Sequence, residues 1–247
     1  MDMQKDSYLG EMDLNRFWEK AIKPLILSVK PEIIVEIGAL SGESSFKILD
    51  YCKYCGAQTI IIEPMPLFDV QALQQNYGEA AKVMQMYSLE ALPRIEKYDL
   101  ILIDGDHNWY TVYNELKLVE RMADQTGRFP IVVLHDTDWP YGRRDLYYFP
   151  ESIPEEMRKP CALRGIEPGR SELLESGAGG MNCTVYNALY EYGEKNGVLT
   201  AIEDFMKESH FKLKFYQLYS NNGLGIIVPE DSPHHSIVNY IIATSGL

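Results

Sequence analysis

Two short stretches of the sequence bring acidic and histidine side chains close together. Asp104 and His107 lie in the first, DGDHNWY, and His135 and Asp136 lie in the second, HDTD. Magnesium is bound mainly by carboxylate oxygens, and it keeps positions open for waters and substrate oxygens. A zinc site would need a cluster richer in histidine or cysteine. The residue types therefore predict that Asp104 and Asp136 hold Mg²⁺.

Each of these stretches follows a run of apolar residues that predicts a buried strand. We expect five such strands, over residues 33–35, 59–62, 82–86, 99–103 and 131–134, with helices over 11–29, 44–51, 67–77 and 109–123. Apolar strands that alternate with helices indicate a parallel sheet covered on both faces, a doubly wound α/β fold. A turn at 221–223 predicts a terminal antiparallel hairpin of strands 211–218 and 224–228. With these two strands, the expected sheet has seven strands and is mostly parallel.

The first strand runs into a glycine loop, EIGALSGESS. Ligands of doubly wound sheets bind outside the carboxyl ends of the strands, where this loop lies. Gly38 and Gly42 are spaced as GxxxG, whereas a dinucleotide fingerprint requires a glycine at the position of Leu40. Glu36 suits a cationic ligand better than a pyrophosphate, and Glu63, at the end of the second strand, is placed to accept both hydroxyls of a ribose. A ribose with a cationic tail and no phosphate describes S-adenosylmethionine.

The segment EIGALSGESS also resembles the first motif of class I S-adenosylmethionine-dependent methyltransferases, especially the metal-dependent O-methyltransferases of the catechol type. The resemblance covers about residues 31–137 and the terminal hairpin, and it implies the Rossmann-like fold of that family. It implies that the acid and glycines of the loop line the methionine part of the cofactor. It also implies that Ser44 contacts the methionine carboxylate and that Ser88 lies near the adenine. We place Asp104 at the border of this site as a further cofactor contact.

The same resemblance bears on the acidic cluster. In the family, the acids matching Asp104 and Asp136 ligate the metal, and the next residue is often Asn or Asp. Here that residue is Thr137, a weaker ligand. The third ligand is therefore open between His135, Thr137, Asp138 and a water molecule.

His107 is the expected general base. The catechol type carries a lysine three residues after its first metal ligand, and His107 stands at that position here, as histidine does in some sugar O-methyltransferases. An imidazole with a pKa of about 6.5 is a suitable acceptor for the proton of a hydroxyl that a metal has acidified. Asp104 and His107 are therefore the predicted catalytic residues.

Residues 138–183 interrupt the alternation of strands and helices, and they are rich in Pro, Gly, Arg and aromatic residues. We interpret this stretch as an insertion that forms a lid over the acceptor. Arg143 and Arg144 would bind an anionic group of the acceptor, and Trp139 and Tyr141 would stack on a sugar ring. The segment WPYGRRDLYYFPE is also similar to bacterial methyltransferases of polysaccharide synthesis. The alternative is a solvated loop whose arginines pair with its glutamates.

Composition and net charge bear on the binding partners and the location of the protein. The chain has 247 residues and a formal net charge of −13, which argues against binding to nucleic acid. It has no apolar run of the roughly 20 residues that a membrane span needs and no signal peptide at its start, so we expect a cytoplasmic protein. Its four cysteines are too few for a disulfide framework.

We expect one methyltransferase domain over residues 1–247, with an N-terminal helical segment at 1–30. The apolar stretch 237–242 packs either on a partner subunit, in a homo-oligomer, or on its own domain. The predicted activity is S-adenosylmethionine-dependent and Mg²⁺-dependent O-methylation of a sugar, glycoconjugate or similar small molecule. Two alternatives remain: an NAD(P)-dependent oxidoreductase, which the GxxxG spacing disfavours, and a non-catalytic S-adenosylmethionine-binding protein.

Overall fold

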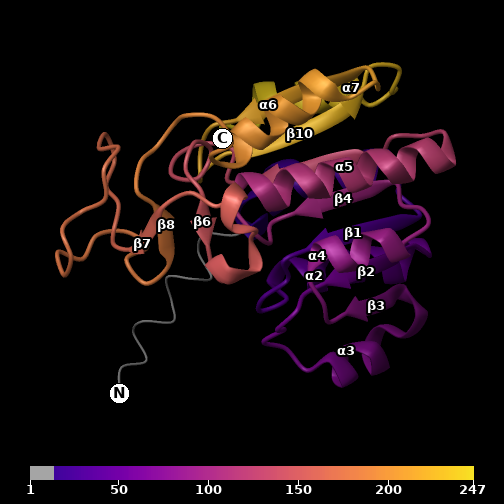
Figure 1. Cartoon of the computed structure of the whole chain (residues 1–247). Helices are drawn as coiled ribbons and strands as arrows, with labels where there is room; N and C mark the ends of the chain where they lie inside the picture. Colours follow the sequence, from indigo (N-terminus) through magenta and orange to yellow (C-terminus); the bar gives the residue numbers. More distant parts are fainter. Residues whose placement is uncertain (1–13) are drawn as a thin grey trace.

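A seven-stranded sheet forms the centre of the fold, with the strand order β3-β2-β1-β4-β5-β10-β9. The computed structural model describes residues 14–247 (Figure 1). The strands are β1 (Ile33–Ile37), β2 (Gln58–Ile62), β3 (Ala81–Met84), β4 (Leu100–Ile103), β5 (Ile131–His135), β9 (Leu213–Leu218) and β10 (Leu224–Pro229). β1 to β5 are parallel, and β10 runs antiparallel to both of its neighbours, β5 and β9. The predicted doubly wound, mostly parallel sheet is confirmed.

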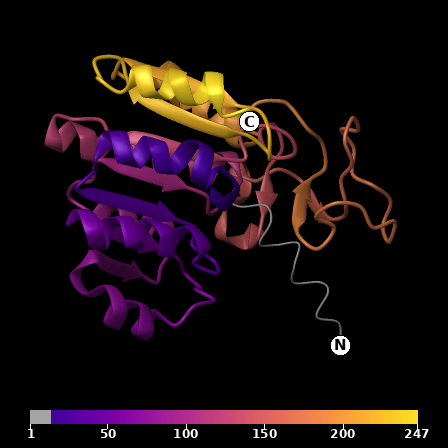
Figure 2. The ribbon, with the colours of Figure 1, turned by 180° about the vertical axis from the view of Figure 1, so that it is seen from behind.

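Helices cover both faces of this sheet. They are α1 (Lys23–Val29), α2 (Glu43–Cys55), α3 (Val70–Tyr77), α4 (Ser88–Ala91), α5 (Trp109–Thr126), α6 (Val198–Glu208) and α7 (His235–Thr244). One face packs against α4, α5 and α6, and the other against α1, α2 and α7 (Figures 1 and 2). Successive strand residues alternate between the two cores, as Ile34 and Val35 of β1 do. The strands are apolar throughout because both faces of the sheet are buried.

The helix predicted over residues 11–29 is divided. Leu14–Phe17 forms a 3₁₀ turn, Trp18–Ile22 forms a π-helical turn, and α1 follows with Pro24 in its first turn. Proline is tolerated there because the N–H groups of a first turn have no partner within the helix. Residues 11–13 of the prediction lie outside the described residues.

The insertion after β5 has secondary structure of its own. β6 (Leu146–Tyr147), β8 (Tyr186–Ala188) and β7 (Cys161–Leu163) form a small antiparallel sheet in the order β6-β8-β7. Strands of two or three residues leave too little apolar alternation to be predicted. Because the chain leaves β5 at its carboxyl end, the insertion lies at the carboxyl edge of the main sheet (Figure 1).

The C-terminal helix α7 packs on its own domain. Val238 and Ile241 are buried in the same core as α1 and β9. These two residues of the apolar stretch 237–242 pack on their own domain, and a homo-oligomer stays a prediction. From residue 14 onward, none of the helices has both the length and the apolar character needed to cross a membrane.

Candidate active site

The glycine loop after β1 lies directly against the end of β4. Gly38 and Gly42 have φ angles of 85° and 84°, in the left-handed region that favours glycine. A Cβ atom at position 38 would lie 2.1 Å from the carbonyl oxygen of Asp104. Position 38 therefore requires glycine, because the loop passes so close to the backbone of Asp104. This contact places the loop beside the acidic cluster.

Glu63 holds the glycine loop in place. Its Oε2 accepts hydrogen bonds from the backbone N–H groups of Ala39 and Leu40, at 3.1 and 3.0 Å. Its Oε1 accepts a hydrogen bond from the N–H of Met65 at 2.9 Å. Sequence reasoning assigned Glu63 only to the ribose and missed this bracing of the loop. The ribose role stays a prediction.

The other expected cofactor residues lie at the same edge of the sheet. Glu36 is buried, and its Oε2 accepts a hydrogen bond from the hydroxyl of Ser45, the residue after Ser44. Ser88 begins α4, just beyond β3. The structure thus brings these residues to the carboxyl ends of neighbouring strands, as the topology requires, and their contacts with a cofactor stay predictions.

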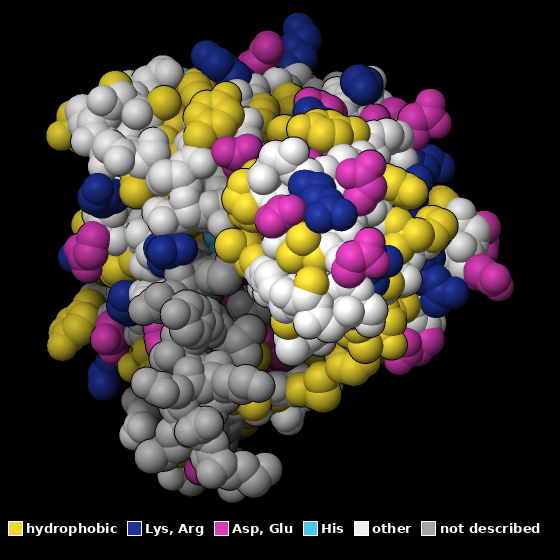
Figure 3. Space-filling view, turned by 90° about the vertical axis from the view of Figure 1, so that its left-hand side faces the viewer, with side chains coloured by type: hydrophobic (Ala, Val, Ile, Leu, Met, Phe, Trp, Pro, Cys, Tyr) yellow, Lys and Arg dark blue, Asp and Glu magenta, His cyan; other side chains and the backbone are white. Residues whose placement is uncertain are grey.

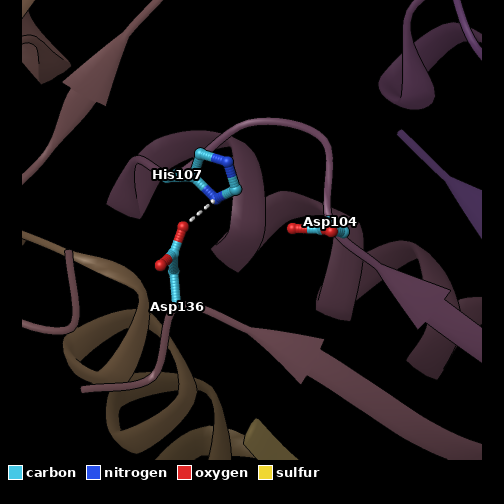
Figure 4. Close-up of side chains that lie close together, drawn as sticks. All are labelled: Asp104, His107 and Asp136. Atoms are coloured by element: carbon cyan, nitrogen blue, oxygen red, sulfur yellow. Dashed lines mark ion pairs between the residues drawn. The ribbon is translucent and has the colours of Figure 1, made fainter. Parts of the chain in front are cut away.

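Asp104, His107 and Asp136 form one cluster, shown in Figure 4. Each offers one potential metal-ligand atom, and these atoms lie within 4.8 Å of one another. Nδ1 of His107 is 3.0 Å from Oδ2 of Asp136, and both side chains are almost fully buried. Oδ1 of Asp136 is buried without a hydrogen-bond partner among residues 14–247. The third member of the cluster is therefore His107, which sequence reasoning had assigned only as a base.

His135 is a buried neighbour of this cluster. Its Nδ1 lies 2.9 Å from Oδ1 of Asp104, and its Nε2 lies 3.1 Å from the carbonyl oxygen of Asn221. Burial alone would lower the pKa of His135, but Asp104 and Asp136 raise it to about 10. Both ring nitrogens of His135 are thus already engaged within the protein, with Asp104 and with Asn221. Sequence reasoning listed His135 as a possible ligand and missed its pairing with Asp104.

Thr137 and Asp138 are the other two residues considered as a third ligand. Thr137 is fully buried, and its carbonyl oxygen accepts a hydrogen bond from the Gln217 side chain at 2.8 Å. The backbone N–H of Asp138 binds the carbonyl oxygen of Asn222. Among the described residues, Asp138 does not belong to the group of carboxylate and imidazole ligand atoms that lie close together.

The first described residues of the chain cover the cluster. The backbone N–H of Leu14 donates a hydrogen bond to Oδ2 of Asp104 at 3.1 Å. The ring of Phe17 meets the ring of His135 edge-on, with the centroids 5.7 Å apart. Both apolar side chains are buried. No local signal in the sequence indicates this contact, because the two segments are distant along the chain.

The insertion holds His107 from the other side. The N–H of Leu146 donates to the carbonyl oxygen of His107 at 3.0 Å. Tyr141 stacks on the His107 ring, and Tyr148 meets it edge-on, each with centroids 6.0 Å apart. Tyr141 is buried, and its hydroxyl donates to Asn187, so it positions His107 rather than offering a free ring face. Tyr148, one of the aromatic residues of the insertion, is 45% exposed.

The two arginines predicted to bind an anionic acceptor are engaged within the protein, which corrects that expectation. Arg144 is fully buried, and it donates to the carbonyl oxygen of Ser171 at 2.6 Å and to Glu191 at 3.3 Å. Arg143 forms two hydrogen bonds of 2.7 Å with Glu203. Burial of the Arg144 guanidinium requires internal partners, and Arg143 is already paired with a carboxylate. Figure 3 shows basic and acidic side chains interspersed on this face.

Trp139, the remaining predicted acceptor residue, also has a partner within the protein. Its indole N–H donates to Oε1 of Glu191 at 3.0 Å. The side chain is only partly exposed. Trp139 and Arg144 therefore bind Glu191, and Arg143 binds Glu203 of α6, so these pairs join the insertion to residues that follow it.

The chain is similar to known methyltransferases. A family model described as a methyltransferase domain matches residues 35–137, which include the glycine loop, Glu63 and the acidic cluster. No curated protein sequence matches the chain.

Solved structures share the fold at low sequence identity. A candidate caffeoyl-CoA O-methyltransferase from Staphylococcus aureus is 16% identical with a TM-score of 0.51, and the match covers 92% of this chain and 90% of that one. The PH0226 protein of Pyrococcus horikoshii is 11% identical with a TM-score of 0.50, over 93% and 100% of the two chains. The CurJ carbon methyltransferase is 14% identical with a TM-score of 0.50, over 94% and 59%. At such identities the likeness establishes the fold and leaves the acceptor atom open.

Proposed function

We propose that this chain, whose residues 35–137 match a methyltransferase domain within a Rossmann-like fold, transfers a methyl group from S-adenosylmethionine to a hydroxyl group of a sugar, glycoconjugate or similar small molecule. One observation carries the choice of a hydroxyl. His107 and Asp136 form a buried pair beside the glycine loop.

This pair suits the removal of a proton. Nδ1 of His107 lies 3.0 Å from Oδ2 of Asp136, so this carboxylate can accept a hydrogen bond from a proton on Nδ1. Nε2 is then left as the proton acceptor, in the arrangement by which a carboxylate orients a histidine base. A hydroxyl must lose its proton when it is methylated, whereas a neutral amine is already nucleophilic. The base therefore supports O-methylation.

The cofactor side of the proposal rests on the glycine loop and on Glu63. The loop closely approaches Asp104, and Glu63 fixes its backbone. We propose that the carboxylate of Glu63 binds the ribose of S-adenosylmethionine and that Glu36, Gly38, Gly42 and Ser44 line its methionine part. S-Adenosylmethionine would supply the methyl group, and the proton of the acceptor hydroxyl would pass to Nε2 of His107.

The residues of the cluster also fit a divalent cation. Asp136 has a buried oxygen without a hydrogen-bond partner in the described part of the chain, and Asp104 and His107 supply the other donor atoms. Asp104 and Asp136 would hold Mg²⁺, with His107 near enough to act as a further ligand or as the base. A cation bound there would lower the pKa of the acceptor hydroxyl.

The aromatic side chains beside the cluster support the proposal of a sugar as acceptor. Tyr148 meets His107 edge-on and is nearly half exposed, and the neighbouring Phe149 is 39% exposed. Exposed aromatic rings pack well on the apolar faces of sugar rings. We propose that this pair, rather than Trp139 and Tyr141, contacts the acceptor.

A methyl-transfer assay over a panel of nucleotide sugars and glycans tests the proposal, with mass spectrometry to locate the methyl group. We expect a product methylated on oxygen, formed by the wild-type protein and lost in His107→Ala. A product methylated on carbon or nitrogen would contradict the choice of a hydroxyl. Binding of S-adenosylmethionine without turnover on any acceptor would instead favour a non-catalytic binding protein.

A further inference from the structure

Asp145 is a buried carboxylate of the insertion that the proposed reaction does not use. It directly precedes β6, and only 1% of its surface is exposed. Its Oδ1 accepts hydrogen bonds from the backbone N–H groups of Trp109 and Gly197, at 2.7 and 2.6 Å. Its Oδ2 accepts a hydrogen bond from the hydroxyl of Tyr147 at 2.6 Å. Both oxygens are therefore engaged, as the burial of a carboxylate requires.

The two backbone donors of Asp145 stand at the starts of two helices. Trp109 is the first residue of α5, and Gly197 directly precedes α6. N–H groups at the start of a helix have no partner within that helix, and the positive end of the helix dipole favours a negative group there. One carboxylate thus serves the starts of both helices.

The bond from Trp109 to Asp145 is one of two that hold the backbone around His107. The N–H of Leu146, the residue after Asp145, donates to the carbonyl oxygen of His107 at 3.0 Å. Two consecutive residues of the insertion therefore bind the chain at His107 and at Trp109. This pair of contacts, 145 to 109 and 146 to 107, is called the backbone clamp below.

The loop itself supplies contacts of another kind. The side chains on either side of His107 both turn to Thr111 of α5: Asp106 accepts from its hydroxyl at 3.1 Å, and Asn108 accepts from its N–H at 2.9 Å. These bonds stay within the loop and α5. The backbone clamp is what joins this loop to the insertion, which leaves the sheet after β5, the strand that precedes Asp136.

We propose that Asp145 is a positioning residue for the base: its carboxylate holds the backbone N–H of Trp109 and so keeps the imidazole of His107 against Asp136. This inference rests on the proposed function. Nδ1 of His107 must stay within hydrogen-bond distance of Asp136, where it lies at 3.0 Å. A misplacement of a reacting group by about 1 Å can lower a rate about 100-fold, so the backbone that carries the ring matters.

Nuclear magnetic resonance of carbon-13-labelled histidine rings tests the position of His107 directly. The signal of His107 is identified by its absence in His107→Ala. We expect Asp145→Ala to shift or broaden this signal, because the ring would move relative to Asp136. The signals of His210 and His235 should stay unchanged and serve as internal references, because these rings pair with Asp124 and with Tyr216.

Steady-state kinetics, with the acceptor found in the panel, measure the effect on the reaction. Asp145→Ala should lower kcat roughly 10- to 100-fold, the scale of a misplaced catalytic group. The Kd for S-adenosylhomocysteine should change little, because none of the contacts of Asp145 reaches the glycine loop or Glu63. Asp145→Asn should lose less activity than Asp145→Ala, because its amide oxygen still accepts from Trp109, but more weakly than a carboxylate does.

Asp204→Ala is the matched control. Asp204 of α6 also accepts a hydrogen bond from Trp109, but from the indole N–H, at 2.9 Å. It therefore joins α6 to α5 without touching the backbone beside His107. Asp204→Ala should keep the wild-type kcat and the wild-type His107 signal, which separates the placement of His107 from a general loosening of the two helices.

The outcomes separate this inference from the proposed function. An unchanged His107 signal or a wild-type kcat in folded Asp145→Ala would overturn the role of Asp145, while turnover by the wild-type protein upheld the proposed function. Equal losses in Asp145→Ala and Asp204→Ala would also overturn it. If Asp145→Ala does not fold, Asp145→Asn carries the test, and an unchanged signal and kcat there would overturn the inference. A wild-type protein that methylates no acceptor would reject the proposed function and this inference together.

Discussion

Nδ1 of His107 lies 3.0 Å from Oδ2 of Asp136, in a pair that is almost fully buried. The two residues follow neighbouring strands, β4 and β5, and α5 separates them along the chain. The other oxygen of Asp136 has no hydrogen-bond partner among the described residues. Asp136 can thus orient a base through one oxygen and hold a cation through the other.

His107→Ala should lower kcat roughly 10²- to 10⁴-fold, because it removes the proposed general base. The affinity for S-adenosylhomocysteine should change little. His210→Ala is a suitable control, because His210 pairs with Asp124 on the surface. Steady-state kinetics with the acceptor found in the panel would measure the effect, and a near-wild-type kcat in His107→Ala would remove the base assignment.

Removal of divalent cations should abolish turnover, and added Mg²⁺ should restore it. EDTA treatment followed by titration with Mg²⁺ or Mn²⁺ provides the activity measurement. Asp136→Asn should weaken binding of Mn²⁺, followed by electron paramagnetic resonance, because an amide oxygen is a weaker ligand than a carboxylate. Full activity in EDTA would reject metal dependence and leave methyl transfer itself standing.

Glu63→Ala should weaken S-adenosylmethionine by about 1.5–3 kcal/mol, the usual contribution of a hydrogen bond to a charged group. Part of this loss reflects the glycine loop, because Glu63 also binds the N–H groups of Ala39 and Leu40. Calorimetry measures the affinity, with the exposed Glu79→Ala as a control. Unchanged affinity in Glu63→Ala would reject the ribose role.

Arg144→Ala should destabilise the protein by roughly 3–5 kcal/mol, because it leaves buried carbonyl groups and Glu191 without their partner. Arg143→Ala should cost only about 0–1 kcal/mol, since its pair with Glu203 is partly exposed to solvent. Urea denaturation measures both. Wild-type stability of Arg144→Ala together with a raised KM for the acceptor would restore the anion-binding role.

Glu115 should make the stability of the protein depend on pH. Burial raises its pKa from 4.5 to about 8 on folding, so the folded state holds the proton more tightly than the unfolded state. Its contribution is fully present below about pH 4.5 and is lost as the pH rises toward 8, by up to about 1.4 kcal/mol per pH unit. The unfolding free energy of Glu115→Gln, relative to that of wild type, should therefore increase as the pH rises from acidic to alkaline. A difference in unfolding free energy that stays constant from pH 5 to pH 9 would contradict this.

Local patterns in the sequence determined the sheet and the edge at which ligands bind. The apolar runs of β1, β2, β4 and β5 predict buried parallel strands because both of their faces must be covered. Gly38 and Gly42 indicate the loop because their backbone conformation excludes most other residues. Parallel strands share one carboxyl edge, so the acids that follow them were expected to meet there.

Only the tertiary structure decided which of these side chains pair. His135 binds Asp104, His107 binds Asp136, and Leu14 covers the cluster through contacts between segments far apart in the chain. The residue type of Arg144 is the same whether its side chain faces solvent or internal carbonyl groups. Its burial could therefore not be predicted from the sequence. A charged group finds its partners through packing, which depends on every element around it and has no periodicity along the chain.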